Sequence, residues 1–266
     1  MRKVNWILEE NTFIEDLNPI SKEIESQGMI PHQISYNPIN NFSKINVKDS
    51  DCIISCGSLH TISRIQRRQP WIPGTFANFK NFECSTYYAY YGNYLLNTNY
   101  VMLPLSEAIR NFEFFTKIFG RMFIRPNSGF KQFTGQEFVL NTFQNNRFGP
   151  DDMLVVISPF KEITEEIRFF CTKEGVITGS TYGNIQNRVD CSDPKYSIPV
   201  LFTNKVLQKV NWKPDSIFFM DIAMIHNLPS LLELNSFSCS GWYSCDPKLI
   251  IQEASKFALE EYNELN

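Results

Sequence analysis

The chain has 266 residues, of which 43% are hydrophobic and 20% charged, and its formal net charge is −3. This length allows one large domain or two small ones, and the composition is that of a globular protein rather than a disordered one. No apolar run approaches the roughly 18 residues that a membrane helix needs. The net negative charge argues against a broad surface for nucleic acid, although it leaves a local basic groove open.

Charged residues lie close to the first short strand in MRKVNWILEE, which argues against a secretory signal peptide. The seven cysteines are odd in number, and no two have CxxC spacing. We therefore expect free thiols in a reducing compartment, and a cytoplasmic protein that does not engage membranes. Cys239 and Cys245 flank a candidate metal loop, but without a nearby histidine they make a poor zinc site.

Strands and helices alternate at the start of the chain, which predicts a small Rossmann-like α/β unit with a parallel sheet. The predicted strands are Lys3–Leu8, Ile30–Tyr36 and Asp51–Cys56, and the predicted helices are Phe13–Gln27, ended by Gly28, and Leu59–Gln69. Ligands of such sheets bind beyond the carboxyl ends of the strands. The residues expected there are Glu9, Glu10, Ser55, Gly57 and Ser58. Because GxGxxG is absent, a dinucleotide is not expected.

The segment that follows predicts little chemistry. Arg64, Arg67 and Arg68 are interpreted as a solvated helix face. Pro70–Pro73 predicts a break, and the tyrosines of Asn78–Thr98 are typical of a packed domain junction. Leu105–Gly120 predicts one helix, with Ser106 as its N-cap and Gly120 as its stop.

A basic strand end runs into a turn of small residues in RMFIRPNSGFKQFTG, residues 121–135. Arg121, Phe123 and Arg125 share one face of the strand. Backbone N–H groups of the Asn127–Gly129 turn can cradle a phosphate, and Arg125 and Lys131 can supply positive charge. The alternative is an ordinary hairpin turn, since the GxxxxGK[ST] phosphate loop is absent.

Two further strands surround a turn at Lys173–Gly175, after a strand at Met153–Ile157. In the first of the two, Glu166, Arg168 and Phe170 share one face, which is either functional or simply the polar outer face of a sheet. The remaining segments are a polar loop at Asn187–Tyr196, a helix within Ser197–Lys209, and a last helix at Asp246–Leu265 with Asp246 as its N-cap and Pro247 at its first position.

The segment SIFFMDIAMIHNLPSLLELNSFSCSGWY, residues 216–243, predicts two apolar strands joined by a His226–Ser230 loop. Glu233 and Asn235 share one face, and antiparallel pairing can bring Asp221 opposite them. Two carboxylates without a counter-charge would repel and lose hydration, which a hard cation such as Mg²⁺ would relieve. The alternative is a solvated sheet face. His226 is interpreted as a structural residue of the loop.

Together these stretches resemble the ATP-grasp fold over residues 98–266, with 1–97 as the smaller α/β domain that commonly precedes it. The family's "V-K-P" strand and glycine-rich loop match residues 124–129, its adenine-binding hinge strand matches Val155–Phe160, and its ribose-binding Glu matches Glu166. Its metal strand "E-x-N" matches Glu233 and Asn235, with Asp221 on the neighbouring strand. The resemblance implies a first lobe at 98–157 and a second lobe at 158–266.

One departure concerns Arg125, because the family usually has Lys there. The runs SPxxxIxxExRFF and ELNxxSxSGWY look like a clade of ATP-grasp proteins from bacteria and phages that carries Arg at this position. Arginine keeps the charge and can grip a phosphate with two donors, so nucleotide binding survives the change. The family's earlier phosphate-side Lys has only a rough counterpart, Lys80.

The resemblance implies an ATP- and Mg²⁺-dependent ligase that activates a carboxylate as an acyl phosphate and joins it to an amine or similar nucleophile, on a small molecule or a peptide. The implied metal ligands are Asp221, Glu233 and Asn235, and the implied catalytic residues are Arg125 and Arg168. The implied nucleotide-binding residues are Arg125, Ser128, Gly129, Lys131, Val156, Ile157, Ser158, Phe160, Glu166 and Arg168. Ser238, Ser240 and Gly241 would shape the loop beside the metal.

Two other classes of function remain open at this level. The Arg for Lys change suits an ATP-binding sensor or regulatory module that no longer ligates. Ligation of nucleic acid through a lysyl–adenylate is disfavoured, because the KxDG signature of such ligases is absent.

Overall fold

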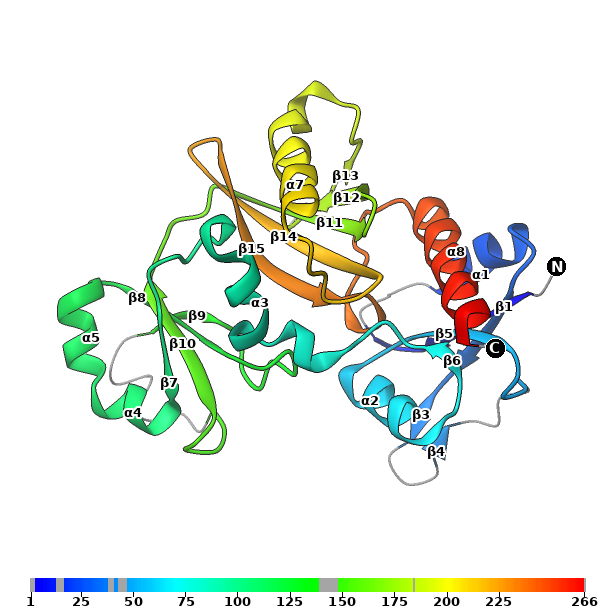
Figure 1. Cartoon of the computed structure of the whole chain (residues 1–266), viewed down its shortest axis with the longest axis horizontal. Coiled ribbons are helices and arrows are strands. Elements are labelled where there is room, and N and C mark those ends of the chain that lie inside the picture. The colour runs from blue at the N-terminus through cyan, green and yellow to red at the C-terminus, as the bar shows by residue number, and fades with distance from the viewer. Residues whose placement is uncertain are drawn as a thin grey trace.

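The structure is a computed structural model that describes residues 3–12, 17–37, 41–42, 47–138, 148–183 and 185–265. It contains three larger sheets and one two-stranded sheet. Figure 1 shows the N-terminal sheet and the sheet of β7 to β10 at opposite ends of the molecule, with the five-stranded sheet between them. The fold is therefore mixed α/β, as the alternating sequence pattern predicts.

The N-terminal sheet has the order β2-β1-β5-β6, and all its pairings are parallel, as predicted. Its elements are β1 (Val4–Glu9), α1 (Leu17–Ser26), β2 (Ile30–Ile34), β5 (Cys52–Cys56), α2 (Leu59–Arg68) and β6 (Ile72–Gly74). Gly28 follows α1 at φ 80°, a conformation that glycine adopts without strain. Residues 13–16, the predicted start of the first helix, lie outside the described residues.

Two predictions for this region are wrong. The strand predicted at Ile30–Tyr36 ends at Ile34, and β3 (Tyr36–Asn37) pairs separately with β4 (Asn41–Phe42). The break predicted at Pro70–Pro73 contains most of β6, which pairs with β5. A strand at the edge of a sheet tolerates proline because one side of its backbone needs no partner.

The second sheet is antiparallel and has the order β7-β10-β8-β9. Its strands are β7 (Val101–Pro104), β8 (Met122–Pro126), β9 (Gln136–Phe138) and β10 (Leu154–Pro159). Before it lie η1 (Phe79–Phe82), α3 (Cys84–Tyr91) and η2 (Gly92–Tyr94), and within it lie α4 (Leu105–Arg110) and α5 (Phe112–Phe119).

The single helix predicted at Leu105–Gly120 is interrupted at Asn111, whose φ and ψ are −103° and 18°. The Asn111 amide donates to the carbonyl oxygen of Glu107, a local side-chain bond that competes with helical hydrogen bonding. Pro104 occupies the N-cap position in place of the predicted Ser106. Gly120 ends α5 at φ 70°, as predicted.

The third sheet is antiparallel and has the order β13-β12-β11-β14-β15. Its elements are β11 (Glu165–Thr172), β12 (Val176–Thr181), β13 (Arg188–Val189), β14 (Ile217–Ile225) and β15 (Leu228–Ser236), with η3 (Pro194–Tyr196), α7 (Ser197–Lys209), η4 (Phe237–Cys239) and α8 (Pro247–Leu265). The Asn187–Tyr196 segment, predicted as a polar loop, thus contains β13 and η3. The Asp246 side chain accepts from the Lys248 N–H at 2.9 Å, which agrees with its predicted role as an N-cap.

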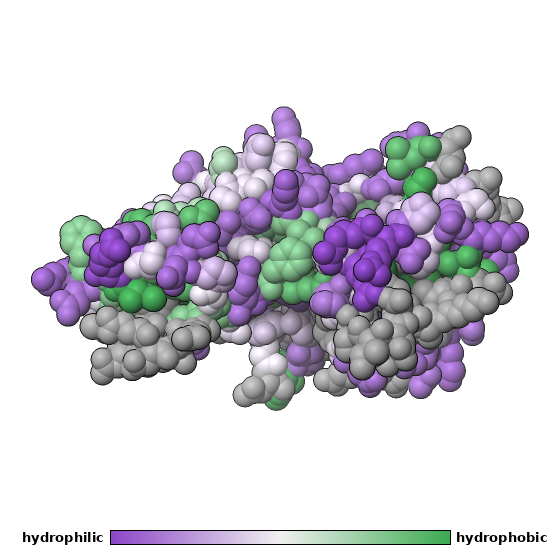
Figure 2. Space-filling view, turned by 90° about the horizontal axis from the view of Figure 1, so that it is seen from below, coloured by the Kyte–Doolittle hydropathy of each residue, from purple (hydrophilic) through white to green (hydrophobic). Residues whose placement is uncertain are grey.

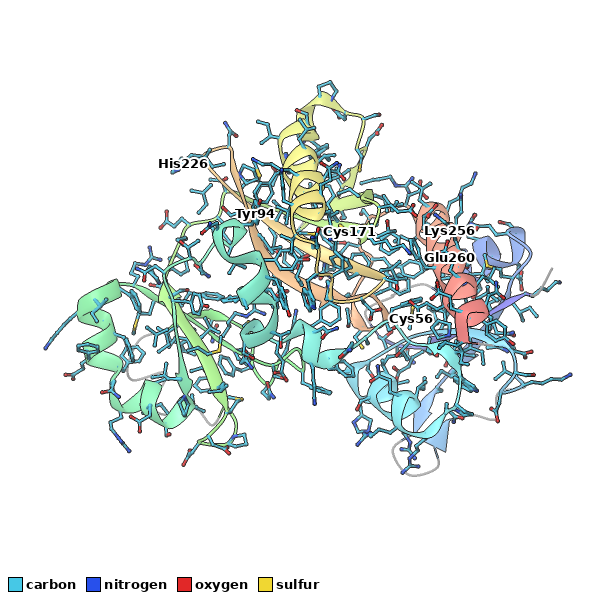
Figure 3. The ribbon with its side chains drawn as sticks, in the orientation of Figure 1. Cys56, Tyr94, Cys171, His226, Lys256 and Glu260 are labelled. Carbon is cyan, nitrogen blue, oxygen red and sulfur yellow. The ribbon has the colours of Figure 1, made fainter. Side chains whose placement is uncertain are left out.

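The loop predicted at His226–Ser230 is shorter in the structure, because β15 already begins at Leu228. His226 and Asn227 have φ of 47° and 65°, which is typical of a two-residue hairpin turn. Figure 3 shows His226 at the tip of this hairpin. The interpretation of His226 as a structural residue of the loop stays a prediction.

The two faces of the five-stranded sheet pack into different cores. Phe169 and Phe218 point into one core, which also contains Tyr87 and Tyr91 of α3. On the other face, Phe237 packs in a core that also contains Trp6 of β1 and residues of α8. Helix α8 therefore packs with both the N-terminal sheet and the five-stranded sheet.

Phe237 is fully buried and contacts five aromatic rings, among them those of Trp6, Phe76 and Phe219. Replacing Phe237 with Ala should lower the free energy of unfolding by about 3–5 kcal/mol, because it removes buried apolar surface and leaves a cavity. Denaturant unfolding measures the loss. Phe114→Ala, at a side chain that is 57% exposed, should change stability far less; equal losses would contradict this account of the core.

All seven cysteines are free thiols, as predicted. Within the part of the chain that the structure describes, no helix combines the length and the apolar character needed to cross a bilayer.

Candidate active site

A row of polar side chains crosses three neighbouring strands. Arg168 of β11 is in register with Asp221 of β14, and Asp221 is in register with Glu233 of β15. Residues directly opposite one another share a face of a sheet, and Asn235 lies two positions beyond Glu233 on that face. The predicted convergence of Asp221, Glu233 and Asn235 is therefore present, although these residues are 14 and 2 positions apart in sequence.

The register of this hairpin shifts beside the site. Asp221 pairs with Glu233, but the next residue, Ile222, pairs with Leu231, so Leu232 is an extra residue in β15. Such a bulge bends its strand and redirects the neighbouring side chains. Sequence alternation alone does not predict it.

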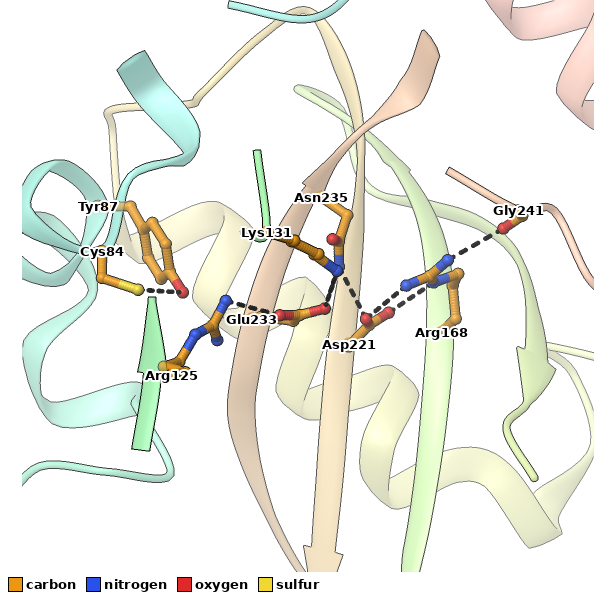
Figure 4. Close-up of polar contacts among 9 residues, drawn as sticks. All are labelled: Cys84, Tyr87, Arg125, Lys131, Arg168, Asp221, Glu233, Asn235 and Gly241. Carbon is orange, nitrogen blue, oxygen red and sulfur yellow. Dashed lines mark hydrogen bonds and ion pairs between the residues drawn. The ribbon is translucent and has the colours of Figure 1, made fainter. Parts of the chain in front are cut away.

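Asp221 and Arg168 form a buried pair with two hydrogen bonds, from Nε to Oδ1 at 2.8 Å and from Nη2 to Oδ2 at 2.7 Å. Their side chains are 1% and 6% exposed. Arg168 Nη1 also donates to the carbonyl oxygen of Gly241 at 3.1 Å, and the ring of Tyr243 lies 4.7 Å from the guanidinium carbon. Geometry of this kind fixes the guanidinium in place. Figure 4 shows the pair and its link to Gly241.

Glu233 lies between two cations. Arg125 Nη2 donates to its Oε2 at 2.8 Å, and Lys131 Nζ donates to its Oε1 at 2.9 Å. Burial opposes the charged form of Glu233, but Lys131 and Arg125 outweigh it and hold the pKa well below its usual range. The Asn235 amide donates to both Glu233 and Asp221, at 2.9 and 2.8 Å, so it bridges the two carboxylates (Figure 4).

Glu166 is near this row and shares its face of β11 with Arg168. Burial raises the pKa of Glu166 to about 7, and the negative charges of Asp221 and Glu233 act in the same direction. Perturbed pKa values of this kind cluster at functional sites.

This pKa predicts a pH effect on stability. The folded protein holds the Glu166 proton up to about pH 7, whereas the unfolded chain releases it near 4.5. The stabilisation from this group is thus complete below pH 4.5 and is lost as the pH rises through 7. Relative to wild type, Glu166→Gln should therefore gain stability between pH 4.5 and 7.5 in urea unfolding. A difference that does not change with pH would contradict the raised pKa.

Some backbone N–H groups of the turn after β8 form hydrogen bonds within the turn. Lys131 N–H donates to the Ser128 carbonyl at 3.2 Å, and Phe130 N–H donates to Ser128 Oγ at 3.1 Å. Among the described residues, no acceptor bonds the N–H groups of Ser128 and Gly129. A Cβ on Gly129 would lie 3.3 Å from Cβ of Phe82, so glycine lets the turn approach η1 closely.

These segments line one cavity, which we call the polar cleft. Arg125, Gly129 and Lys131 come from β8 and its turn, and Arg168 and Asn235 come from the five-stranded sheet. The loop after β15 contributes Ser240, Gly241 and Tyr243, and the N-terminal part of the chain contributes Leu59, Phe79 and Phe82. Ser238, also predicted in this loop, instead accepts from the Phe76 N–H at 2.9 Å.

The hinge segment borders a second cavity, which we call the apolar pocket. Val156 and Ile157 are buried in β10, which pairs with β7 on one side and with β8 on the other. Phe160 lines the apolar pocket, together with Leu96, Asn97, Phe123, Pro159, Lys161, Ile163 and Leu232. Ser158 is fully buried, and within the described residues its Oγ has no hydrogen-bond partner.

Sequence reasoning missed the role of the tyrosine-rich segment. Tyr87 and Cys84 of α3 lie beside the Arg125 guanidinium, and the Tyr87 hydroxyl is 3.7 Å from the Cys84 sulfur (Figure 4). The Ser85 N–H donates to Asn127 Oδ1 at 2.7 Å, which attaches the start of α3 to the end of β8. The aromatic content indicated packing, but nothing local indicated which strand it packs against.

The proposed metal ligands can be tested by their chemistry. Asp221, Glu233 and Asn235 offer two carboxylates and an amide, which are the hard oxygen donors that Mg²⁺ takes. In the structure the Asn235 nitrogen faces the carboxylates, and a metal would need the amide oxygen there. Among the described residues, no group of three or more His, Cys, Asp or Glu side chains could hold a metal.

Comparison with known proteins is consistent with this geometry. Residues 107–252, more than half of the chain, match the family model described as ATP-grasp domain, R2K clade family 2. No curated protein matches significantly.

Solved structures resemble the whole chain in fold. D-cycloserine synthetase DcsG has a TM-score of 0.61 at 9% identity, covering 96% of this chain and 99% of its own. ATP-grasp ligase PsnB, complexed with the precursor peptide PsnA2 and AMPPNP, has 0.58 at 11%, covering 96% and 97%. D-alanine–D-alanine ligase from Bacillus anthracis, complexed with ATP, has 0.57 at 10%, covering 100% and 98%.

Proposed function

Because the chain belongs to the ATP-grasp family described as R2K clade family 2, we propose that it is an ATP- and Mg²⁺-dependent ligase that joins a carboxylate to an amine or similar nucleophile. The observation that carries this proposal is the polar cleft, in which Arg125 and Lys131 meet Glu233 across two different sheets. A metal-bound triphosphate needs cations that face its phosphate oxygens and carboxylates that hold its metal, and the polar cleft offers both kinds of group.

We assign the triphosphate to the polar cleft. Arg125 and Lys131 would leave Glu233 and bind phosphate oxygens, and the N–H groups of Ser128 and Gly129 would donate to the same group. Arginine at position 125 can bind two phosphate oxygens at once. Its buried position beside α3 supports this role, because the guanidinium is already oriented.

We assign the nucleoside to the hinge. Adenine would enter the apolar pocket beside Phe160, next to the hinge residues Val156, Ile157 and Ser158, and the Ser158 hydroxyl has no partner among the described residues. Glu166, on the strand after the hinge, would bind the ribose. The apolar lining of this pocket supports the assignment, since pockets for small molecules are lined predominantly by hydrophobic and aromatic side chains.

Mg²⁺ would be held by Asp221, Glu233 and Asn235, and when bound it neutralises the phosphates and orients the γ-phosphoryl group. Arg168 fixes the position of Asp221 through two hydrogen bonds. Its Nη1 atom, now on the Gly241 carbonyl, would reach the developing negative charge of the substrate.

The chemistry that follows transfers the γ-phosphoryl group to a substrate carboxylate, which forms an acyl phosphate and releases ADP. An amine then attacks the acyl carbon and displaces inorganic phosphate, and it loses a proton as the amide forms. Positioning and neutralisation of charge supply most of the catalysis in such transfers. The proposed substrates are a small molecule or a peptide, since proteins with this fold include a ligase complexed with a precursor peptide and a D-alanine–D-alanine ligase.

We also propose the domain division 1–97 and 98–266, with lobes at 98–157 and 158–266. The three separate sheets support it. Helix α8 belongs to the second of these domains but packs against the first, because its core cluster includes residues of β1 and β5.

Calorimetry and crystallography with a non-hydrolysable ATP analogue test this function. With Mn²⁺ in place of Mg²⁺, the analogue should bind, and the anomalous signal of the metal should lie between Asp221 and Glu233. ADP should form from ATP when carboxylates and amines are supplied together. Analogue binding without ADP formation across a broad screen of acids and amines would favour the sensor function instead.

A further inference from the structure

The polar cleft has two kinds of lining, and the proposed phosphate and metal groups use only one of them. The charged lining consists of the cations Arg125, Lys131 and Arg168. Uncharged side chains line the cleft beside them, and none of these has been assigned to the nucleotide or the metal. We call them the neutral wall, which is made of Leu59, Phe79, Phe82, Ser236, Cys239 and Ser240.

The neutral wall is built where the N-terminal part of the chain meets the phosphate turn. Leu59 is the first residue of α2, and Phe79 begins η1. Phe79 and Cys239 pack against the core that lies under α2. The Phe79 ring also packs on Phe130 of the phosphate turn, with 4.4 Å between ring centroids. A substrate whose carboxylate meets the γ-phosphoryl group would therefore have the neutral wall beside its carbon chain.

The lining offers no counter-charge for an ammonium group. Among the described residues that line the polar cleft, none is Asp or Glu. Asp221 and Glu233 lie behind its cations, to which they are bonded (Figure 4), and both are proposed to hold Mg²⁺. Glu166 is proposed to bind the ribose. These three carboxylates are thus committed before a substrate is considered.

Glu9 of β1 lies near Cys239, but it is engaged elsewhere. Its side chain belongs to a residue that is only 5% exposed. Its Oε2 atom accepts from the Ser58 N–H at 2.6 Å, and its Oε1 atom accepts from the Thr61 hydroxyl at 2.7 Å. A Cβ on Gly57 would lie 2.5 Å from Oε2, so the chain closes tightly over this carboxylate. Glu9 is therefore held at the start of α2 and does not face the cleft.

The one titratable group of the neutral wall stays uncharged. Burial raises the pKa of the Cys239 thiol to about 12, and the charge of Glu9 acts in the same direction. An α-amino acid would thus bring its ammonium group among cations, aromatic rings and neutral hydroxyls. An ion that loses water without gaining a counter-charge is strongly disfavoured. An apolar carbon chain, in contrast, gains from contact with the leucine and the two phenylalanines.

We propose that the carboxylate substrate is an apolar carboxylic acid without an ammonium group next to its carboxylate, and that the neutral wall selects it. This inference rests on the proposed function of the cleft, and it deepens that function by naming the class of the acid. The carboxylate meets the cations and the γ-phosphoryl group, while the carbon chain lies along the neutral wall. Free α-amino acids are the class that the wall excludes.

Two pairs of acids that differ only by an α-ammonium group test the proposal, 3-phenylpropanoate with phenylalanine and pentanoate with norvaline. Each acid is supplied to the full chain with MgATP and hydroxylamine, whose nitrogen attacks the acyl phosphate, displaces phosphate and gives a hydroxamate. In each pair, kcat/KM for ADP and hydroxamate formation should be at least tenfold higher for the acid that lacks the ammonium group. Equal or higher values for the amino acids would refute the selection.

Leu59→Glu supplies the missing counter-charge. The ratio of kcat/KM values within each pair should fall at least tenfold in this variant, while the Kd of the ATP analogue stays within about twofold of wild type. A carboxylate in the first turn of a helix is favourable, so the variant should fold, which circular dichroism checks. Leu59→Gln is the matched control, because it has the same shape without the charge, and it should keep the wild-type ratio. The same ratio in both variants would contradict the proposal.

Calorimetry with the ATP analogue and Mg²⁺ separates this proposal from the ligase function. The protein saturated with both should bind 3-phenylpropanoate with a Kd at least tenfold lower than that of phenylalanine. This preference without ADP formation from any acid would support the neutral wall and refute the ligase function. ADP formation that does not distinguish the acids, or an equal Kd for both, would refute the neutral wall and leave the ligase function standing.

Discussion

Glu233→Gln should reduce ATP-dependent ADP formation on the order of a thousandfold. The amide keeps the size of the side chain but removes the negative charge that now faces Arg125 at 2.8 Å and Lys131 at 2.9 Å. The substitution would take a carboxylate from the proposed Mg²⁺ site, and removing one preorganised charge of this kind costs about a hundred- to a thousandfold in rate. Steady-state measurement of ADP release with the cognate substrates gives the value.

The same variant needs a test of folding, because it leaves the buried Arg125 without its counter-charge. Circular dichroism and thermal melting should show a folded protein that is less stable than wild type. Glu113→Gln, on the exposed side of α5, is the matched control and should keep full activity. Unchanged turnover in a folded Glu233→Gln protein would rule out the proposed metal site.

The second large effect is expected at Arg125. Arg125→Ala should lower kcat/KM for ATP by about a hundred- to a thousandfold, since it removes a buried cation that can face the phosphates. Arg125→Lys keeps the charge and loses the planar fork of donors, so it should retain more activity than Arg125→Ala. Kinetics over a range of ATP concentrations, with the Kd of the analogue, separates binding from turnover.

Arg121→Ala provides the control for Arg125. Arg121 precedes the same strand, but its guanidinium pairs with the exposed side chains of Glu137 and Glu162, at 2.7 and 2.9 Å. Its removal should leave kcat/KM near the wild-type value, because exposed ion pairs contribute little. If both alanine variants lost activity equally, a general effect on β8 would explain the data and the role of Arg125 would be refuted.

Local pattern determined most of the elements. Alternation along β15 placed Glu233 and Asn235 on one face, and the same rule placed Arg168 beside Glu166 on β11. Capping signals located the start of α8 at Asp246 and the stop of α5 at Gly120. These features depend on neighbours within a few residues, so they can be predicted from a single sequence.

Other features depend on specific hydrogen bonds and strand pairings that the residue pattern does not reveal. These features are the helix break at Asn111, the strand at Ile72–Gly74 and the bulge at Leu232. Lys80, the rough counterpart of the family's earlier phosphate-side Lys, lines the groove between α2, β6 and η1, and its role stays a prediction.

The sequence by itself determined which residue types are available and which of them share a face, because side-chain direction follows the backbone period. Only the tertiary structure decides that Arg125 donates a hydrogen bond to Glu233, 108 positions later, and that Cys84 and Tyr87 of α3 lie beside the Arg125 guanidinium. The physical reason is that strand register and the packing between sheets depend on burying apolar side chains that lie far apart in sequence. One arrangement is favoured only when all these side chains pack together.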